Sequence, residues 1–384
     1  MLFSLSLLAF LYWLTLSSFI LINGRKIKYL RDIKELENTE KPNISIIIPV
    51  RNEELHLRDA LRSVCEMDYK NLRIIVINDR SADKSSDILD QMKIEYENLE
   101  ILNIEYLPDG WLGKNHALYS GFRITKDPYI LFTDADVKFD KYVLNKSINY
   151  FIKNQLDHLT ILPGIISPST ILKSVLTSFI IILTAIQRPW AARNKRSNAS
   201  IGVGAFNLVK RDTYNKAGTH KAISMSADDD LKLAAMIKSY GGKSDVLYGI
   251  GQIELEWYAS INEFIQGLMK NAFSGFKYNI YYVLSGVAAL LLLFVIPLPL
   301  IFLFGNTIEK ELIIGTMIFQ FILYWKMPGN AGRWWYGFMS VYGGIILIYI
   351  ILKASISNIR DGGIYWRDTF YSLKDLREQN KLFK

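Results

Sequence analysis

The amino-acid sequence predicts an α/β domain with a largely parallel sheet, held at a membrane by hydrophobic helices on both sides of it. Three observations lead to this prediction. From residue 43 to about 165, short β-branched runs alternate with amphipathic stretches, as in strands joined by crossover helices. An uncharged segment of membrane-spanning length precedes this region, and long apolar runs follow it after residue 281.

Composition supports a membrane-bound protein. The 384 residues are 50% hydrophobic and carry a formal net charge of +8. The basic residues stand beside the apolar runs, as at 24–31 and after 353, which favours a cytoplasmic membrane face over nucleic acid as partner. A single cysteine, Cys65, excludes a disulfide within the chain, and no Cys/His cluster has zinc-ligand spacing.

Residues 1–23 are predicted to be an N-terminal transmembrane anchor, because positions 2–23 carry no charge and reach the roughly 20 residues that span a bilayer. A cleaved signal peptide is the alternative. The start lacks basic residues and positive charges follow the segment, so a retained anchor with a cytoplasmic C-terminal end is favoured. A polar linker, 24–42, ends at Pro42.

The catalytic α/β domain is predicted at residues 43–256. Its first strands are expected at 44–50, 72–79, 100–106 and 129–134, and the helices between them at 53–66, 85–96 and 115–125. In such sheets ligands bind at the carboxyl ends of the strands. Asp79 and Asp134 both fall at such ends.

Two segments are predicted to lie in the membrane interface. Near 168–190 only about twelve residues are strongly apolar, and a crossing there would separate the two parts of the domain. Residues 257–280 are predicted to lie there too.

Residues 281–353 are predicted to form transmembrane helices, with a kink at Pro297 and Pro299 in the first. A basic tail, 354–384, follows. Three crossings would place this tail outside, whereas its charge favours the inside, so the number of crossings stays open.

Asp134 and Asp136 follow an apolar strand and stand one residue apart. Carboxylates this close raise each other's pKa unless a cation lies between them. Their hard oxygen ligands suit Mg²⁺ or Mn²⁺. The alternative is a solvated turn, where aspartate is common.

Two further residues indicate a nucleotide diphosphate. Asp79 closes a strand and can accept hydrogen bonds from a nucleobase or ribose, although Ser81 or Asp83 beside it could simply cap the next helix. Lys114 follows a glycine-containing loop and opens a helix, whose amide end also attracts anions. A surface lysine on a loop is the alternative for Lys114.

Three aspartates, residues 228–230, open an amphipathic helix. Acids are favoured at a helix N-terminus, but three in a row indicate that at least one faces a site, where it could act as a general base. Gly202 and Gly204 precede them and would allow a substrate to approach the backbone closely.

Taken together, the sequence resembles the membrane-bound members of glycosyltransferase family 2. The resemblance rests on "SIIIPVRNEE", "IIVINDRSADKS", "GWLGKNHAL", "FTDAD", "GVGAFNLVKRDTY" and "ADDDLKLA", which lie between residues 43 and 245. The "GWLGK" loop and "GGIYWRDTFY" (362–371) look most like the enzymes that glycosylate carotenoid acids of the diaponeurosporenoate type, or those associated with hopanoid synthesis.

The resemblance implies a GT-A fold, which is a Rossmann-like mixed sheet, and a role for each matching residue. Pro49, Arg51, Glu53, Asp79, Lys114 and Asp134 would bind the nucleotide sugar, Asp136 and Asp134 the Mg²⁺ or Mn²⁺, Gly202, Gly204 and Ala205 the acceptor, and Asp230, with Asp229 second, would be the base. Two positions depart from the pattern, because Asn78 replaces an acid and Arg80 a glycine.

The implied activity is inverting, metal-dependent transfer of one sugar from a nucleotide-diphospho-sugar, expected to be a UDP-sugar. The acceptor would be a membrane lipid such as a carotenoid acid or another isoprenoid or glycolipid precursor. A Q-x-x-R-W signature of polymer synthases is absent at 252–257. The alternatives are a polyprenyl-phosphate sugar transferase, a polysaccharide synthase, or a non-catalytic membrane binding protein. A multi-pass cell-membrane location, with the catalytic domain in the cytoplasm among membrane lipids, is expected.

Overall fold

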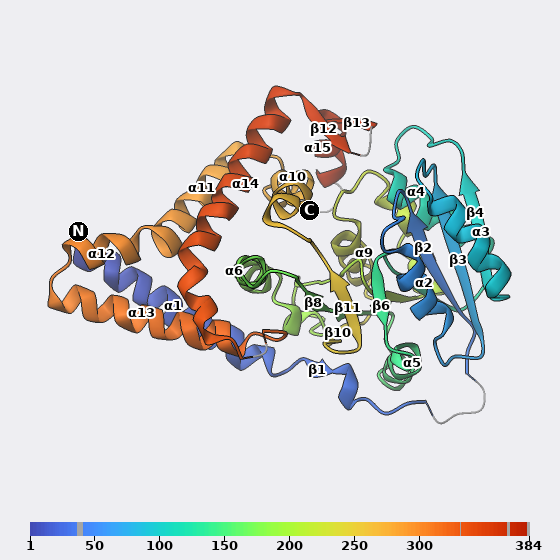
Figure 1. Cartoon of the computed structure of the whole chain (residues 1–384), viewed down its shortest axis with the longest axis horizontal. Helices are drawn as coiled ribbons and strands as arrows, with labels where there is room; N and C mark the ends of the chain where they lie inside the picture. Colours follow the sequence, from blue (N-terminus) through green and yellow to red (C-terminus); the bar gives the residue numbers. More distant parts are fainter. Residues whose placement is uncertain (37–40, 331, 367–368, 382–384) are drawn as a thin grey trace.

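The computed structural model describes the whole chain apart from residues 37–40, 331, 367–368 and 382–384. Figure 1 shows an α/β domain on one side and an arm of apolar helices on the other. Helices α6 (Thr170–Gln187) and α10 (Ile261–Gly275) lie between these two parts. The arrangement places the α/β domain next to the arm rather than within it.

The four predicted strands form β2 (Ile44–Val50), β3 (Leu72–Asp79), β4 (Leu99–Ile104) and β5 (Tyr129–Phe132). They join β1 (Lys28–Tyr29), β7 (His158–Leu162), β9 (Asn207–Lys210) and β10 (Ser244–Tyr248) in the order β1-β10-β7-β9-β5-β2-β3-β4. Only β9 runs antiparallel to its neighbours in this sheet. The predicted mixed sheet is therefore confirmed. A smaller sheet contains β6 (Val137–Phe139), β11 (Ile253–Glu256) and β8 (Gly164–Ile166).

The strands read as continuous apolar runs because helices cover both faces of the sheet. Along β2, Ile46 and Ile48 belong to one core and Ile47 to the other. The first core is closed by α2 (Leu57–Cys65), α3 (Ser85–Glu95) and α5 (Val143–Lys153). The second is closed by α4 (Gly113–Ile124), α7 (Arg211–Lys216) and α9 (Asp229–Ser239). Burying each isoleucine side chain contributes roughly 1.5–3 kcal/mol.

The arm consists of α1 (Leu2–Gly24), α11 (Ile280–Leu290), the π-helical turn Leu291–Val295, α12 (Pro297–Phe304), α13 (Thr307–Lys326) and α14 (Ser340–Arg360). Among the residues described, three segments have the length and hydropathy to cross a membrane, namely Leu2–Gly24, Thr170–Ala191 and Trp334–Arg360. Segments Ile280–Val295 and Pro297–Phe304, bent by 45° at their junction, could together be a fourth. The predicted kink at Pro297 is thus present.

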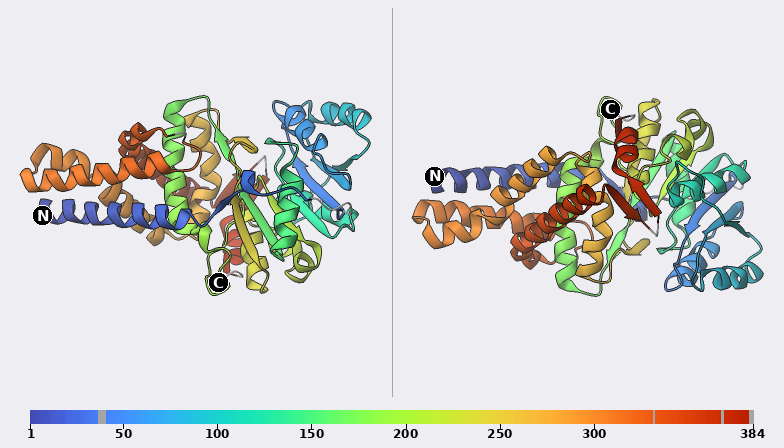
Figure 2. Two further views of the ribbon diagram at one scale, coloured as in Figure 1. Left: turned by 90° about the horizontal axis from the view of Figure 1, so that it is seen from below. Right: turned by 90° about the horizontal axis from the view of Figure 1, so that it is seen from above.

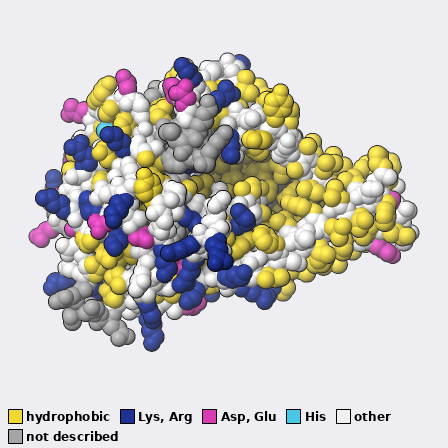
Figure 3. Space-filling view, turned by 180° about the vertical axis from the view of Figure 1, so that it is seen from behind, with side chains coloured by type: hydrophobic (Ala, Val, Ile, Leu, Met, Phe, Trp, Pro, Cys, Tyr) yellow, Lys and Arg dark blue, Asp and Glu magenta, His cyan; other side chains and the backbone are white. Residues whose placement is uncertain are grey.

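Helices α1 and α13 lie side by side along the arm, whereas α6 and α10 run across its base (Figures 1 and 2). Ser17 Oγ on α1 donates a hydrogen bond to the Phe319 carbonyl of α13 at 3.1 Å, and Trp13 Nε1 donates to the Leu293 carbonyl at 2.9 Å. Hydrophobic side chains cover the arm, and lysine and arginine side chains gather on the adjoining domain (Figure 3). Length and hydropathy would allow α6 to span, but its direction differs from that of α1.

The C-terminal tail folds back onto the catalytic side of the molecule. Strands β12 (Gly363–Trp366) and β13 (Thr369–Ser372) form a hairpin, and α15 (Leu373–Lys381) follows. Ile364, Tyr371, Leu373 and Leu376 from this tail share a core with Leu112, Phe273, Tyr278 and Val283. Because the tail touches the α/β domain, any complete membrane crossings between them would have to be even in number.

Candidate active site

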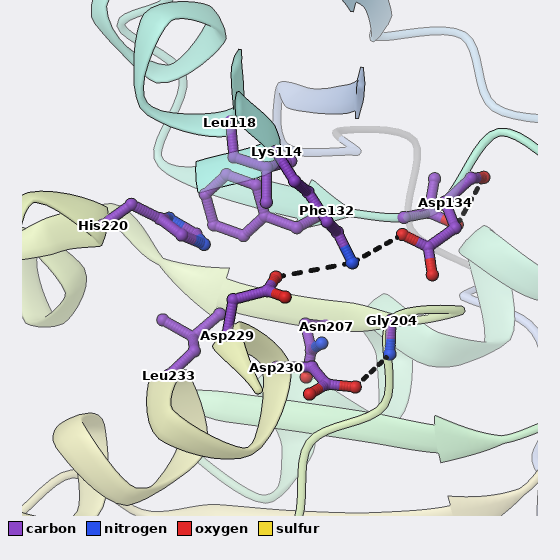
Figure 4. A pocket seen from close by; sticks show the side chains of 11 residues that line it. Lys114, Leu118, Phe132, Asp134, Gly204, Asn207, His220, Asp229, Asp230 and Leu233 are labelled. Atoms are coloured by element: carbon purple, nitrogen blue, oxygen red, sulfur yellow. Dashed lines mark hydrogen bonds and ion pairs between the residues drawn. The ribbon is translucent and has the colours of Figure 1, made fainter. Parts of the chain in front are cut away.

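Lys114 lies at the centre of a cluster of carboxylates. Helix α4 begins at Gly113, so Lys114 stands in its first turn, as predicted. Its Nζ lies 2.8 Å from Asp134 Oδ1 and 3.4 Å from Asp229 Oδ2 (Figure 4). Burial alone would lower the pKa of Lys114, but Asp134, Asp229 and Asp230 outweigh it and raise the pKa above its usual value. Lys114 is therefore a permanent cation between two carboxylate groups.

Asp134 and Asp136 follow β5, as expected for the two candidate metal ligands. The Asp134 amide donates a hydrogen bond to the Gly204 carbonyl at 3.1 Å. Burial, followed by the charges of Asp134 and Glu53, raises the pKa of Asp136 to about 7. Asp136 thus lacks an adequate counter-charge.

The donor chemistry of this pair fits a hard divalent cation. Within the described ranges, no group of three or more His, Cys, Asp or Glu side chains could hold a metal ion. Mg²⁺ sites commonly use only one or two carboxylates and complete the shell with substrate phosphates and water. Asp134 and Asp136 therefore suit Mg²⁺ or Mn²⁺ that arrives with a diphosphate.

Asp230 and Asp229 open α9 on the other side of Lys114. Asp230 accepts hydrogen bonds from the amides of Gly204 at 2.9 Å and of Leu231 at 2.8 Å. Burial and then Asp229 raise the pKa of Asp230 to about 7, although Lys114 acts in the opposite direction. Asp229 is only 6% exposed and contacts Lys114. The raised pKa of Asp230 suits a general base near neutral pH.

Neighbouring protein atoms leave no room for a side chain at Gly202 and Gly204. A Cβ at position 202 would overlap the carbonyl of Asp230, and one at 204 would overlap the Asp134 carboxylate. Ala205 is buried in the main core, and its carbonyl accepts a hydrogen bond from Thr133 Oγ1 at 2.8 Å. The segment therefore positions Asp134 and Asp230, and the Ala205 side chain is not placed to contact an acceptor.

Asp79 closes β3 as predicted, but two arginines cover it. Arg80 Nε and Nη2 donate to the two oxygens of Asp79 at 2.8 and 3.1 Å, and Arg51 Nη1 lies 3.8 Å from Oδ2. Arg80 has φ +56°, a left-handed backbone conformation that glycine adopts more readily than arginine. A Cβ at Gly113 would lie 2.5 Å from Asp79 Oδ2, so the start of α4 approaches this acid closely.

The loop after β2, which contains Arg51 and Glu53, packs against the loop after β3. Pro49 is the penultimate residue of β2. The Glu53 amide donates to Ser85 Oγ at 2.9 Å, and Asn52 Oδ1 accepts from the Ala82 amide at 2.8 Å. Both loops therefore meet at one edge of the sheet, where the sequence placed the nucleotide.

The sequence patterns do not predict a role for three residues near the site. Asn115 Nδ2 donates to the carbonyls of residues 223, 224 and 226 at 2.9–3.0 Å and so ties α4 to the segment before Asp229. His220 lines the same pocket as Lys114 and Asp230. Tyr258 precedes α10, and burial followed by the charge of Asp136 raises its pKa to about 12. Asn115 lies in "GWLGKNHAL", but the other two belong to no recognised motif.

Comparison with known proteins gives a family match for one part of the chain. The family model for glycosyl transferase family 2 matches residues 45–218. A 4,4'-diaponeurosporenoate glycosyltransferase from Staphylococcus haemolyticus is 26% identical over 212 residues, which are 54% of this chain and 54% of that protein. A poly-beta-1,6-N-acetyl-D-glucosamine synthase from Staphylococcus epidermidis is 27% identical over 211 residues, 54% of this chain and 49% of that one. The match thus spans about half the length of these relatives.

A solved structure shares the fold over nearly the whole chain. It is a mannosyltransferase from Pyrobaculum calidifontis in complex with GDP-Man and Mn²⁺, with a TM-score of 0.60 and 14% identity. The alignment covers 94% of this chain and 99% of that one. With the mixed sheet and its covering helices, this likeness confirms the GT-A fold. The chain therefore contains a glycosyl transferase family 2 domain.

Proposed function

We propose that this protein is an inverting glycosyltransferase that moves one sugar from a nucleotide-diphospho-sugar to a lipid acceptor at the membrane surface. The observation that supports it most directly is the position of Lys114, which bridges Asp134, inside the region that matches glycosyl transferase family 2, and Asp229, which follows that region. A cation there can exchange its carboxylate partners for a diphosphate. Asp134 and Asp229, once Lys114 binds the diphosphate instead, would face the place where donor and acceptor meet.

The donor would lie along the carboxyl edge of the sheet. Pro49, Arg51, Glu53 and Asp79 would contact the nucleotide, expected to be uridine. Asp79 reaches a base only if Arg80 releases it, since both Asp79 oxygens are held in the described structure. An Arg80 that turns away from Asp79 could itself pair with the diphosphate.

Lys114 would bind the diphosphate, and Asp136 with Asp134 would hold Mg²⁺ or Mn²⁺. When bound, the metal would offset the negative charge that develops on the leaving group. The negative charges of Asp134 and Glu53 raise the pKa of Asp136. A divalent cation would lower it again, because its positive charge stabilises the carboxylate. Relatives with known ligands support this expectation, since the mannosyltransferase of the same fold was solved with Mn²⁺.

Asp230 would act as the general base. Its carboxylate would take the proton from the acceptor hydroxyl while the acceptor oxygen bonds to the anomeric carbon. The bond from that carbon to the diphosphate oxygen breaks on the opposite face, so the configuration inverts and the nucleoside diphosphate leaves. The amides of Gly204 and Leu231 hold the Asp230 carboxylate in place, which supports its role.

A lipid acceptor is supported by the position of the segment before α10. Tyr258 lies close enough to Asp136 for their charges to interact, and Trp257 stacks on Tyr258 with ring centroids 5.7 Å apart. Helices α6 and α10 cross the base of the apolar arm between the arm and the domain (Figures 1 and 2). An acceptor with a long apolar body could remain in the bilayer while its hydroxyl or carboxylate reaches Asp230.

For the membrane we propose a cytoplasmic catalytic domain, with α1 crossing once and α11–α12 and α13 entering as a helical hairpin. Helices α6, α10 and α14 would lie along the cytoplasmic surface, although Thr170–Ala191 and Trp334–Arg360 have the length and hydropathy to cross a membrane. This arrangement makes an even number of crossings between α10 and the tail, as the tail's packing on Leu112 and Phe273 requires. It also places the basic tail on the inner side.

Transfer assays test the proposed activity. Membranes with the wild-type protein would receive labelled UDP-glucose, UDP-N-acetylglucosamine or GDP-mannose with Mn²⁺ or Mg²⁺, and labelled lipids would be analysed. We expect one labelled lipid, lost in Asp136→Asn and Asp230→Asn but not in Asp59→Asn, whose side chain is 66% exposed outside the site. A labelled polymer would favour a synthase instead, and a labelled prenyl phosphate would favour a polyprenyl-phosphate transferase. Absence of both transfer and nucleotide binding would favour the non-catalytic alternative.

Cysteine labelling tests the topology independently. In a Cys65→Ser background, exposed Thr307 at the start of α13 and exposed Lys374 on α15 would each be replaced by cysteine. We expect a membrane-impermeant maleimide to label position 307 on intact cells and position 374 only after permeabilisation. Labelling of both from the same side would contradict the helical hairpin.

A further inference from the structure

His220 is a buried histidine that the proposed mechanism does not use. It belongs to α8 (Thr219–Ala222), is 1% exposed and lies beside Lys114, Asp229 and Asp230 in the lining of the pocket. Figure 4 shows its ring directed towards Asp229. Its Nε2 has no hydrogen-bond partner among the described residues, whereas its Nδ1 has one.

The partner of Nδ1 determines which ring nitrogen carries the proton. The His220 backbone amide donates to the Tyr214 hydroxyl oxygen at 2.8 Å, and the same hydroxyl lies 2.6 Å from Nδ1. The hydroxyl oxygen already accepts the amide proton, so its own proton is directed to Nδ1. A neutral imidazole then carries its hydrogen on Nε2. Burial, followed by the charge of Lys114, lowers the pKa of His220 to about 3, which keeps the ring neutral.

The geometry leaves a neutral N–H group facing a polar pocket without an acceptor. Buried polar groups are nearly always paired, and one that is not requires an explanation, such as a catalytic role or a bound water or ion. Leu118, Phe132 and Leu233 line the pocket with His220, as do the charged side chains of Lys114, Asp229 and Asp230. A neutral donor at this place suits an uncharged oxygen, because a phosphate would be attracted to Lys114 instead.

The residues lining this pocket indicate which part of the donor it would hold. Asp229 and Asp230 line it with His220, whereas Asp79 and Arg51, where the nucleotide is expected, are not part of the lining. Lys114 lines the pocket too, and Gly113 next to it approaches Asp79 closely. The region beyond a diphosphate on Lys114 and next to the general base is where the transferred sugar must lie.

We propose that Nε2–H of His220 donates a hydrogen bond to one ring hydroxyl of the transferred sugar, which makes His220 a residue that determines sugar specificity. The Tyr214 hydroxyl is the positioning group that fixes the tautomer. This inference rests on the proposed glycosyltransferase function.

The test compares binding of the whole sugar nucleotide with binding of the nucleoside diphosphate. Detergent-solubilised full-length protein with Mn²⁺ would be titrated with UDP-glucose, UDP-N-acetylglucosamine, GDP-mannose, UDP and GDP. For His220→Phe, which keeps an aromatic ring against Phe132 and Tyr214, we expect the affinity for the bound sugar nucleotide to fall about tenfold or more. Affinity for the matching nucleoside diphosphate should stay unchanged, which also verifies folding.

Two further variants separate the hydrogen bond from packing. His220→Gln retains a side-chain N–H and should recover part of the sugar-dependent affinity. Tyr214→Phe keeps the aromatic ring but removes the hydroxyl that fixes the tautomer of His220. This variant should therefore weaken binding of the sugar nucleotide less than His220→Phe does.

Donors lacking one sugar hydroxyl at a time complete the test. Wild-type protein should bind one such donor about tenfold more weakly than the parent. The His220→Phe variant should bind this donor and its parent equally.

Two results would overturn the inference in different ways. If the wild type binds a sugar nucleotide and His220→Phe binds it equally well, or loses sugar nucleotide and nucleoside diphosphate affinity alike, His220 does not contact the sugar. If the wild type binds none of the five nucleotides, the proposed function fails, and the role of His220 fails with it.

Discussion

The backbone of Gly204 and the carboxylate of Asp134 approach so closely that a Cβ atom at position 204 would overlap Asp134 Oδ2. The same residue accepts a hydrogen bond from the Asp134 amide and donates one to Asp230 Oδ2. A residue without a side chain thus links the candidate metal ligand to the candidate base. The spacing of these two acids depends on the backbone between them.

Replacing Gly204 with alanine should therefore inactivate the protein without unfolding it. The added methyl group must displace the Asp134 carboxylate, which is partly exposed and can move. A displacement of about 1 Å in an active site costs about 100-fold in rate, which is the loss we expect in sugar transfer. Steady-state transfer assays and thermal unfolding of the same preparations would check this.

Gly275→Ala is a matched control for that substitution. Among the described residues, no atom outside its own stretch of helix lies within 4 Å of the position of its Cβ, and it ends helix α10. Transfer by this variant should equal that of the wild type. An active Gly204→Ala protein would show that the close approach to Asp134 has no catalytic consequence.

The raised pKa of Asp136 makes the metal-free protein less stable as pH rises. Its pKa is about 7 in the folded protein, whereas that of an isolated aspartate is 3.8, so the folded state binds more protons between these values. The free energy of unfolding should then fall from about pH 4 to pH 7 and level off above it. Asp136→Asn should lessen this fall and give a higher Tm than wild type at pH 8, measured without divalent cations.

The contribution of a metal can be read from the same experiment. Mn²⁺ with UDP should raise the Tm of the wild type at pH 8 but have little effect on Asp136→Asn, because a ligand stabilises only a state that binds it. An equal rise in both proteins would contradict a metal site at Asp136.

Lys114→Met should weaken nucleoside diphosphate binding. A hydrogen bond to a charged group is worth about 1.5–3 kcal/mol, so the affinity for UDP or GDP should fall about 10- to 100-fold in titration calorimetry. Loss of this cation also removes the ion pairs that Lys114 makes with Asp134 and Asp229, so the variant should lose more stability at pH 8 than at pH 6. Lys70→Met, on the exposed surface, should change neither property.

Loosening the tail should impair catalysis from a distance. Leu376 is 3% exposed and lines a small pocket with residues 225–228, the segment that leads into Asp229. Leu376→Ala leaves a cavity at that contact, and we expect at least a tenfold lower transfer rate and faster proteolysis of the tail. Glu378→Ala, which is exposed on the same helix, should behave as the wild type. If the tail of Leu376→Ala is cleaved faster but transfer stays at the wild-type rate, the contact between Leu376 and residues 225–228 does not support catalysis.

Sequence placed Asp79, Lys114 and Asp134 correctly on the fold because strand ends and helix starts are local features. Apolar runs of strand length end at Asp79 and just before Asp134, and a glycine opens the helix that holds Lys114. Local patterns of this kind can be recognised in the sequence without knowing the tertiary contacts.

Other features depended on contacts between distant segments. The pairing of Asp79 with Arg51 joins residues 28 positions apart, and that of Lys114 with Asp229 joins residues 115 apart. Nothing in the residues around His220 indicates that Tyr214 holds its ring or that Lys114 lies nearby. The glycines at 202 and 204 were recognised as sites of close approach, but the atoms that approach them belong to Asp230 and Asp134.

The tail also sets the order in which the protein can become functional. Ile364, Tyr371, Leu373 and Leu376 complete the core around Leu112, and they follow α14, the last of the candidate membrane helices in the described part of the chain. During synthesis the α/β domain could fold as soon as it leaves the ribosome. The tail residues that pack against Leu112, just before Lys114, would still be missing at that stage. The enzyme would then acquire activity only after the last helices had entered the bilayer, which ties catalysis to correct membrane insertion.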